Sequence, residues 1–252
     1  MLKNKVVAIT GATGLIGSTF AKGIVDNGGK VILGDISKEK GVQLQEELGK
    51  ENCIFLYVDV TDPKSIDEFI FQGVGRFNKI DAAIHSAYPR SEQWGTAFEN
   101  LKIEDLTKDL SGHLGGSILL SQRIMKFFIQ QNYGNLIHVS SIQGVSNPKF
   151  DHYKGTTMVS PIEYSAIKSS IISITKYLAK YYKNNNIRVN CISPGGILDS
   201  QPEEFLEKYK KSCASKGMLN SEDLIGTIVY LISDMSKYLN GQNIIIDDGW
   251  TL

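Results

Sequence analysis

The sequence predicts one α/β domain with a doubly wound parallel sheet and helices on both faces. Short apolar runs alternate with helical patterns along all 252 residues, as expected for parallel strands joined by crossover helices. A glycine-rich turn separates the first run from the first helix. Polar residues, proline or glycine follow most later runs, at the strand ends where such sheets bind ligands. No linker or internal repeat marks a second domain, so residues 1–252 are expected to form a single unit.

The first strand, turn, helix and second strand together form a βαβ unit. The strand is Val6–Thr10, and the turn reads Gly11-Ala12-Thr13-Gly14-Leu15-Ile16-Gly17. The helix ends at the Gly28-Gly29 break, and the second strand ends at Asp35. Glycines let a backbone approach a pyrophosphate, the helix N-terminus offers it unpaired N–H groups, and a terminal acid can bond ribose hydroxyls. The unit therefore predicts a dinucleotide-binding Rossmann fold.

The remaining elements continue the alternation of strand and helix. Further strands are expected at 53–58, 80–84, 136–139, 187–192 and 243–246. Helices are expected at 38–48 after a Ser37 cap, after a Thr61 or Asp62 cap, and at about 103–110, 114–130, 161–183 and 222–231. The carboxyl ends of the parallel strands should meet at one edge of the sheet, and a ligand site is expected there.

Composition favours a soluble globular protein. Hydrophobic residues make up 42% of the chain and charged residues 21%, and the formal net charge is zero. The charge balance favours neither nucleic acid nor an anionic membrane as a partner. The cysteines Cys53, Cys191 and Cys213 have no paired or metal-ligand spacing, so thiols in a reducing compartment and no metal site are expected. With no signal peptide or long apolar span visible, we expect a cytoplasmic protein that acts on a small molecule.

One predicted helix start carries a chemical pair. Ser160 is expected to cap the helix, Pro161 to take its first position and Glu163 to complete a capping box. Tyr164 and Lys168 then share one helix face, four residues apart. An ammonium beside a phenol favours the phenolate. The same spacing is common on ordinary surface helices, so the pair is informative only together with the rest of the chain.

With these residues in hand, the chain resembles the short-chain dehydrogenases/reductases from Val6 to Leu252. The landmarks occur in that family's order: the glycine turn, Asp35, Asp59-Val60, Ser141, Tyr164 with Lys168, and Pro194-Gly195. The resemblance implies hydride transfer between a nicotinamide cofactor and a substrate carbon. It implies that Tyr164 is the general acid/base, that Lys168 lowers its pKa and holds the nicotinamide ribose, and that Ser141 bonds the reacting oxygen. Ser141 is preferred over Ser140 because Ile142-Gln143-Gly144 follows it in the family's pattern.

The resemblance also implies which residues hold the cofactor. They are Gly11, Thr13, Gly14, Leu15, Ile16, Gly17, Asp35, Asp59, Val60, Ser86, Ala87, Tyr164, Lys168, Pro194, Gly195 and Ile197. NAD is expected rather than NADP, because the Asp35 carboxylate would repel a 2′-phosphate. Ile36 and Ser37, not a cation, follow Asp35.

Several positions depart from the family's usual pattern. Leu15 stands where the short form of the glycine turn has its middle glycine, a spacing that resembles the extended, sugar-nucleotide-modifying branch. His85 begins the His-Ser-Ala-Tyr segment that replaces Asn-Asn-Ala-Gly, and we interpret it as a hydrogen-bonded residue at a strand end. His113 stands where the family has a catalytic Asn. It is expected either to keep the main-chain role of that Asn and add a titratable relay, or to be a helix-entry histidine with no proton role.

Three loops at the active-site end are expected to contact substrate, at about 88–100, 145–160 and 197–218. The first carries Tyr88 and Arg90, and Arg90 is interpreted as a clamp for a phosphate or carboxylate, or else as an ordinary surface arginine. The second makes the Ser141–Tyr164 spacing about ten residues longer than the family's, as expected for a lid or substrate wall. Gln143 and Tyr153 are further expected contacts. In the third, Asp199 stands where the family often has a Thr.

The sequence therefore predicts an NAD-dependent oxidoreductase that acts on a secondary alcohol or ketone of a polar, sugar-like or phosphorylated substrate. Three segments resemble oxidoreductases of flagellin modification and sialic-acid-like sugar pathways: Tyr88-Pro89-Arg90, the 155–161 stretch and Asp247-Asp248-Gly249. The alternatives are a dehydratase or epimerase that uses NAD transiently and a non-catalytic NAD-binding scaffold. By resemblance, the helices at about 113–130 and 161–183 are expected to form a homodimer or homotetramer.

Overall fold

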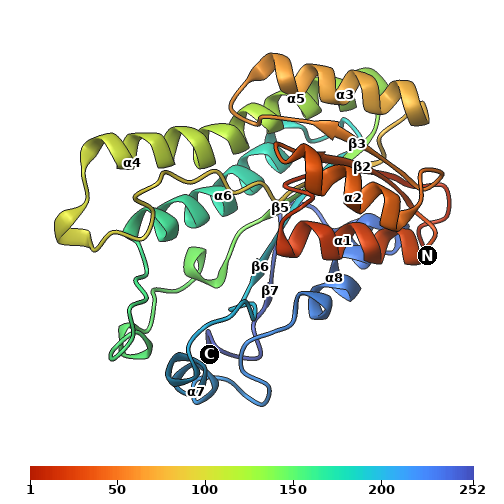
Figure 1. Ribbon diagram of the computed structural model, residues 1–252. Helices are drawn as coiled ribbons and strands as arrows, with labels where there is room; N and C mark the ends of the chain where they lie inside the picture. The colour runs from red at the N-terminus through yellow and green to blue at the C-terminus, as the bar shows by residue number, and fades with distance from the viewer.

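The computed structural model describes residues 1–252 and has a seven-stranded sheet at its centre (Figure 1). The strands are β1 (Val6–Thr10), β2 (Lys30–Asp35), β3 (Cys53–Tyr57), β4 (Ala82–His85), β5 (Gly134–Val139), β6 (Ile187–Pro194) and β7 (Asn243–Ile246). They lie in the order β3-β2-β1-β4-β5-β6-β7, and every neighbouring pair is parallel. The order changes direction between β1 and β4, and a crevice for ligand forms at such a switch point. The predicted single-domain, doubly wound fold is confirmed.

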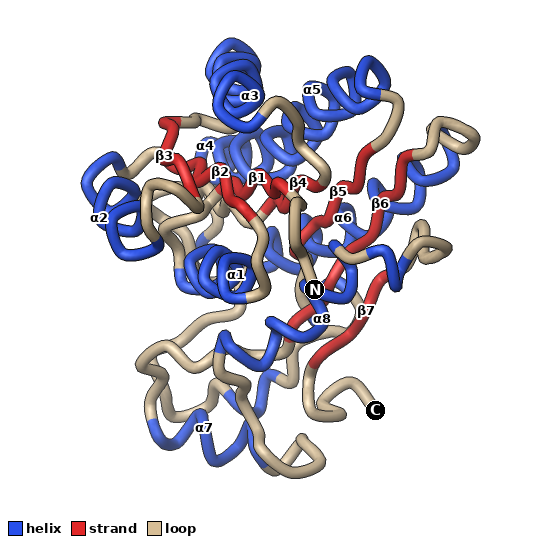
Figure 2. Tube along the Cα trace, turned by 90° about the vertical axis from the view of Figure 1, so that its right-hand side faces the viewer, coloured by secondary structure: helices blue, strands red, loops and turns tan.

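Helices cover both faces of the sheet. They are α1 (Leu15–Asp26), α2 (Lys38–Leu48), α3 (Pro63–Phe77), α4 (Ile103–Asp109), α5 (Gly116–Gln131), α6 (Ile162–Tyr181), α7 (Glu203–Lys210) and α8 (Ile225–Ile232). Figure 2 shows α1, α2 and α8 on one side of the strands, and α3, α5 and α6 on the other. α7 lies away from the sheet, near the C-terminus, with the loops that extend beyond the strand ends (Figure 1).

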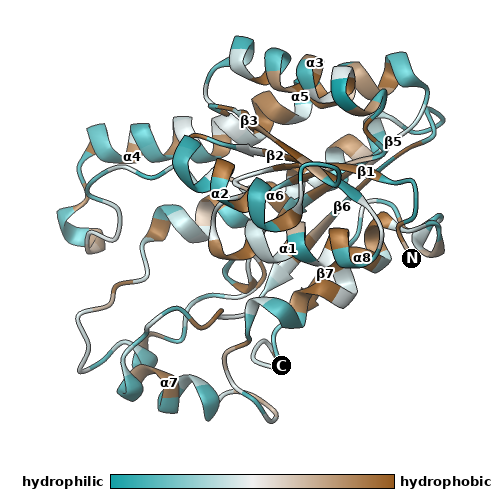
Figure 3. Ribbon diagram, turned by 45° about the vertical axis from the view of Figure 1, so that its right-hand side comes forward, coloured by the Kyte–Doolittle hydropathy of each residue, from teal (hydrophilic) through white to brown (hydrophobic).

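Each face of the sheet has its own apolar layer. On one face, strand residues such as Ile9 pack with Phe20 of α1 and Ile228 of α8. On the other, Phe69 of α3 and Phe128 of α5 belong to the second cluster. Burying each such side chain contributes about 1.5–3 kcal/mol. The strands and α8 are accordingly strongly hydrophobic, whereas the other helices are mixed or hydrophilic (Figure 3).

The two helices predicted near 103–110 and 114–130 are continuous in the structure. α4 passes into a π-helical turn, Leu110–Gly115, which passes into α5 without a break. Glycines at 112, 115 and 116 weaken the helical pattern in the sequence, and two separate helices are therefore predicted there. His113 therefore lies within the π-helical turn rather than at the head of a separate helix.

The capping box predicted at the start of α6 is wrong. The helix begins at Ile162 with Pro161 as its N-cap, and no side chain caps it. The Ser160 hydroxyl instead donates to Gln143 Oε1 at 2.9 Å. Glu163 is buried, with no partner for either carboxylate oxygen. Tyr164 still falls in the first turn of the helix.

Other local predictions agree with the structure. The Asp62 side chain caps α3 by accepting from the Lys64 N–H. The helix predicted at 222–231 is an exception, because it is split into a 3₁₀ turn, Ser221–Leu224, and α8. Cys53 and Cys191 are buried free thiols. None of the helices combines the length and the apolar content needed to cross a bilayer.

Candidate active site

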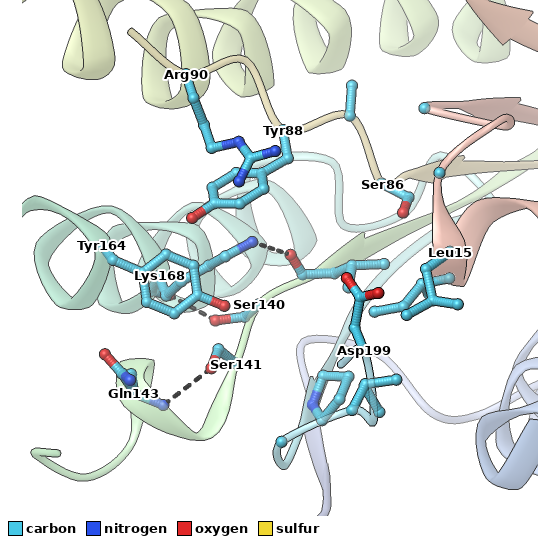
Figure 4. Close-up of a pocket in the computed structure, with 18 of the residues that line it drawn as sticks. Leu15, Ser86, Tyr88, Arg90, Ser140, Ser141, Gln143, Tyr164, Lys168 and Asp199 are labelled. Atoms are coloured by element: carbon cyan, nitrogen blue, oxygen red, sulfur yellow. Dashed lines mark hydrogen bonds between the residues drawn. The ribbon is translucent and has the colours of Figure 1, made fainter. Parts of the chain in front are cut away.

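A cleft of about 1070 Å³ opens beyond the carboxyl ends of the central strands and is walled by most of the predicted site residues. Those that line it are Gly11, Thr13, Gly14, Leu15, Ile16, Asp35, Asp59, Val60, Ser86, Ala87, Ser141, Tyr164, Lys168, Pro194, Gly195 and Ile197, together with Tyr88, Arg90, Gln143 and Tyr153. Gly17 and His113 do not line it. Segments far apart in the sequence thus converge on one space (Figure 4).

The glycine turn has the shape that a pyrophosphate requires. Gly11 has a φ of 74°, and a Cβ there would lie 2.6 Å from Ala87 N. A Cβ on Gly17 would lie 2.1 Å from the Gly11 carbonyl oxygen, so both glycines are needed for close packing of the turn. At Gly14 the nearest neighbour of a Cβ would be that same oxygen, at 3.4 Å. α1 begins after Gly14 with no side-chain cap, which leaves its first N–H groups available to an anion.

The Asp35 carboxylate lies at the end of β2, in the cleft. Oδ2 accepts from Thr13 N at 3.0 Å and Oδ1 accepts from Ser37 N at 3.1 Å. These bonds fix the carboxylate beside the glycine turn, where the family places a ribose. Lys40 also lines this end of the cleft. The turn, the open helix N-terminus and the fixed acid together fit a dinucleotide.

Ser141, Tyr164 and Lys168 come from the end of β5 and the first turns of α6 and face the same space (Figure 4). Lys168 Nζ donates to the Val139 carbonyl at 3.0 Å and lies 5.5 Å from the centroid of the Tyr164 ring. The Ser140 hydroxyl donates to the Lys168 carbonyl at 2.7 Å, so it ties the strand to the helix. This agrees with the choice of Ser141 as the serine available to substrate.

Burial controls the charges of this group. It raises the pKa of Tyr164, and the Ser141 hydroxyl partly opposes the rise. Burial lowers the pKa of Lys168 to about 8. Proximity to an ammonium was expected to lower the pKa of Tyr164, but the pKa is raised, and burial of the phenol is the largest cause.

Two buried histidines, His85 and His113, lie near Lys168. His113 is buried, its ring centroid lies 4.7 Å from that of Tyr88, and its Nδ1 has no hydrogen-bond partner. Burial and the nearby Lys168 charge lower its pKa well below the usual range, so its imidazole is neutral near pH 7. His85 is paired at both nitrogens, with Thr10 Oγ1 at 2.8 Å and Ser117 Oγ at 2.9 Å. His85 thus fits the interpretation of a hydrogen-bonded residue at a strand end.

The loop after β4 forms one wall of the substrate side. The Arg90 guanidinium lies over the Tyr88 ring, 5.0 Å from its centroid, and Tyr88 packs edge-on against Trp94 at 5.2 Å. Ser91 fixes the loop to the buried Asp109 carboxylate through both its N–H and its hydroxyl. Arg90 therefore lines the cleft on Tyr88, whose ring lies 5.7 Å from that of Tyr164.

The cleft has further lining residues that were not singled out from the sequence. They are His152, Met158, Phe205, Tyr209, Met218 and Trp250, and all but Trp250 lie in the loops that were expected to contact substrate. Several of these side chains pack together as a small separate cluster that joins the loop before α6 to α7 and the C-terminal segment. Trp250 follows shortly after β7, so its position near a strand end was the available signal. The aromatic residues of α7 gave no such signal.

The third predicted loop is anchored to the C-terminal segment. The Asp248 carboxylate accepts backbone N–H groups from Ser215, Lys216 and Gly217, which lowers its pKa. Asp199 lines the cleft, and its N–H donates to Gln201 Oε1 at 2.8 Å.

Comparison with known proteins identifies the family. A short-chain dehydrogenase family model, described as enoyl-(acyl carrier protein) reductase, matches residues 11–251. The chain belongs to the short-chain dehydrogenase/reductase family. It is 46% identical to post-translational flagellin modification protein A of Campylobacter coli over the full length of both chains. It is 30% identical to 7α-hydroxysteroid dehydrogenase of Bacteroides fragilis, over 99% of this chain and 95% of the relative.

A solved structure gives the same assignment. The crystal structure of a short-chain dehydrogenase from Leptospira borgpetersenii with bound NAD⁺ matches with a TM-score of 0.86 and 31% identity, over 100% of this chain and 94% of that chain. As a member of the short-chain dehydrogenase/reductase family, the protein is a nicotinamide-dependent oxidoreductase.

Proposed function

We propose that the protein transfers a hydride between NAD and a secondary alcohol or ketone of a polar, sugar-like or phosphorylated small molecule. The observation that carries the proposal is the convergence of Ser141, Tyr164 and Lys168 with the glycine turn and Asp35 in one cleft. The proposal treats residues 1–252 as one domain whose loops at 88–100, 145–160 and 197–218 determine the choice of substrate.

Ser141, Tyr164 and Lys168 each have a different role in the proposed reaction. A nicotinamide bound in this cleft would supply the hydride-transfer chemistry. Tyr164 gives a proton to, or takes one from, the substrate oxygen, and Ser141 donates a hydrogen bond to that oxygen as charge develops. Lys168, held by the Val139 carbonyl, supplies the positive charge that favours ionised Tyr164 and holds the nicotinamide ribose. His113 acts through the main chain of the π-helical turn, because its neutral side chain lies outside the cleft.

NAD is proposed over NADP because Asp35 is fixed at the ribose end of the cleft. A carboxylate there accepts ribose hydroxyls and repels a 2′-phosphate. Asp59, Val60, Ser86, Ala87, and the residues from Pro194 to Ile197 complete the proposed cofactor walls.

A polar substrate is proposed because Arg90 lies at the substrate side of the cleft beside Tyr88, where it can bond a phosphate or carboxylate. Gln143 and Tyr153 add neutral polar groups on the other side. The flagellin modification relative, similar along its whole length, supports a role in carbohydrate modification.

A homodimer or homotetramer in the cytoplasm is proposed, with contacts through the helices at about 113–130 and 161–183. Apolar and aromatic side chains on these helices are exposed, among them Ile118, Ile129, Tyr177 and Tyr181. Exposed apolar faces of this kind are typical of subunit interfaces.

The ratio of NADH formed to product formed tests the proposal. Purified protein is incubated with NAD⁺ and a panel of phosphorylated, amino and neutral sugars, and NADH and product are both quantified. One NADH for each molecule of oxidised product is expected. Product without net NADH would instead indicate a dehydratase or epimerase, and NAD binding without turnover of any panel member would indicate a scaffold.

A further inference from the structure

We propose that Gln143 and Tyr153 form a second oxygen-binding subsite, which selects substrates that carry a hydroxyl, ether or carbonyl oxygen in addition to the reacting one. The inference rests on the proposed function and makes its substrate class more specific. The subsite favours hydroxyketones and polyhydroxylated rings over isolated ketones and alcohols.

The Gln143 side chain is fixed by hydrogen bonds from three directions. Its Oε1 accepts from Ser160 Oγ at 2.9 Å and from Ser165 Oγ at 3.1 Å. Its Nε2 donates to the Tyr153 hydroxyl at 3.4 Å. Its backbone N–H donates to Ser141 Oγ at 3.1 Å, so the same residue also contacts the reacting-oxygen site. The amide is therefore preorganised, with its oxygen satisfied by the two serines.

Two hydrogen-bond donors remain on this pair. An amide nitrogen carries two hydrogens, and Tyr153 accepts one of those on Gln143. The phenol, having accepted that bond, still has its own O–H proton, which can turn to a ligand or to the neighbouring Ser160 hydroxyl. Both residues line the cleft and are only half-buried, so the donors are accessible to a ligand. The bond from the Gln143 backbone N–H to Ser141 Oγ at 3.1 Å ties this pair to the reacting-oxygen site.

A donor pair of this kind fits an acceptor oxygen. In a simple ketone the only oxygen is already occupied by Ser141 and Tyr164, which leaves the second pair of donors without a partner. A buried donor left unpaired by a bound ligand costs affinity, and sites built to bond a hydroxyl discriminate against analogues that lack it. Pro148 and Met158, which also line this wall, supply apolar surface for the C–H groups of a ring.

The subsite depends on the long loop that precedes α6. Tyr153 and Ser160 lie in that loop, whereas Ser165 lies in α6 and Gln143 follows the catalytic serine. The loop therefore has a specific consequence: it brings a phenol and a hydroxyl onto Gln143 and converts a flexible amide into a fixed donor.

Matched ligands test the subsite without requiring turnover. Binding of trans-cyclohexane-1,2-diol and cyclohexanol to the protein–NAD⁺ complex is measured by saturation-transfer NMR titration. We expect the wild type to bind the diol about fivefold more tightly, which corresponds to one net hydrogen bond. The preference should fall in Tyr153→Phe and in Gln143→Met and vanish in the double variant. Equal affinities in the wild type, no detectable diol binding, or a preference that survives both substitutions would overturn the proposal.

The serines are positioning residues, and their variants separate positioning from a merely structural effect. Ser160→Ala with Ser165→Ala should lower the diol preference while NADH affinity stays the same, and Ser160→Thr with Ser165→Thr should restore that preference.

Failure of the subsite is distinguishable from failure of the proposed function. If Tyr164→Phe keeps the diol preference but no alcohol yields NADH in the wild type, the subsite stands and the redox proposal fails. If the wild type instead forms NADH equally well from both alcohols, the redox proposal stands and the subsite fails.

Discussion

Replacing single glycines of the cofactor turn should separate cofactor binding from folding. At Gly14, φ is −75° and ψ is 166°, which an alanine adopts without strain, and the new Cβ meets only the Gly11 oxygen at 3.4 Å. Gly14→Ala should therefore change the free energy of unfolding by no more than about 0.5 kcal/mol. Gly14 lines the cleft at the start of α1, so an added methyl group should obstruct a pyrophosphate that approaches the helix N-terminus. The Kd for NADH should rise at least tenfold, which is about 1.4 kcal/mol.

Gly17→Ala should instead damage the fold. Its Cβ would lie 2.1 Å from the Gly11 carbonyl oxygen, which is backbone and can move only with the whole turn. Overpacking of this kind costs about 1–3 kcal/mol. Gly75→Ala in α3 is the matched control, because a Cβ there has no neighbour within 4 Å.

Urea unfolding and fluorescence titration with NADH measure the two quantities on all three variants. Normal NADH affinity in Gly14→Ala would refute the assignment of this turn to the pyrophosphate. An undamaged Gly17→Ala would refute the packing argument for the turn. The Gly75→Ala control should keep wild-type NADH affinity and lose no stability.

Three further predictions follow from buried or fixed charges. Burial raises the pKa of Glu163 above its usual 4.5, so the fold loses stability as the pH rises from 4.5 to that raised value, and the loss is complete above it. In urea unfolding at neutral pH, Glu163→Gln should be about 1 kcal/mol more stable than the wild type, and this difference should disappear below pH 4.5. A difference between variant and wild type that is the same at both pH values would contradict this. Burial lowers the pKa of Lys168 from 10.5 to about 8, so the wild type should gain stability relative to Lys168→Met as the pH rises between these values, and a flat difference in thermal melts would oppose it. Asp35→Asn keeps one acceptor for Thr13 and removes the charge, so the ratio of NADPH to NADH affinity should rise at least about tenfold in fluorescence titrations; an unchanged ratio would argue against the role of Asp35 in NAD preference.

Much of the site could be predicted because its residues occupy ends of parallel strands. The glycine turn, Asp35, Ser141 and the Tyr164–Lys168 pair each follow from strand–helix alternation and a fixed spacing, which are local signals. The helix that carries the pair was predicted correctly even though its cap was not. Ser160 bonds Gln143, 17 positions away, and no local rule for helix starts reveals that competing partner.

The unpredicted features depend on contacts between segments that are distant in the sequence. Trp250 and Phe205 reach the cleft because the loop before α6, α7 and the C-terminal segment pack into one cluster. The burial that sets the pKa of Tyr164 has the same origin, since it depends on everything packed around the phenol. The continuity of α4 and α5 through a π-helical turn was not predicted, because the glycines between them indicate a helix break.

The central claim is that Tyr164 exchanges the proton during NAD-dependent oxidation. The most direct measurement is single-turnover NADH formation by wild type and Tyr164→Phe, with a substrate from the sugar panel and with NADH affinity measured in parallel. We predict a loss of about 10²–10⁴-fold in the rate of hydride transfer, with the Kd for NADH within about twofold of wild type. A Tyr164→Phe variant that forms NADH at the wild-type rate would contradict the account.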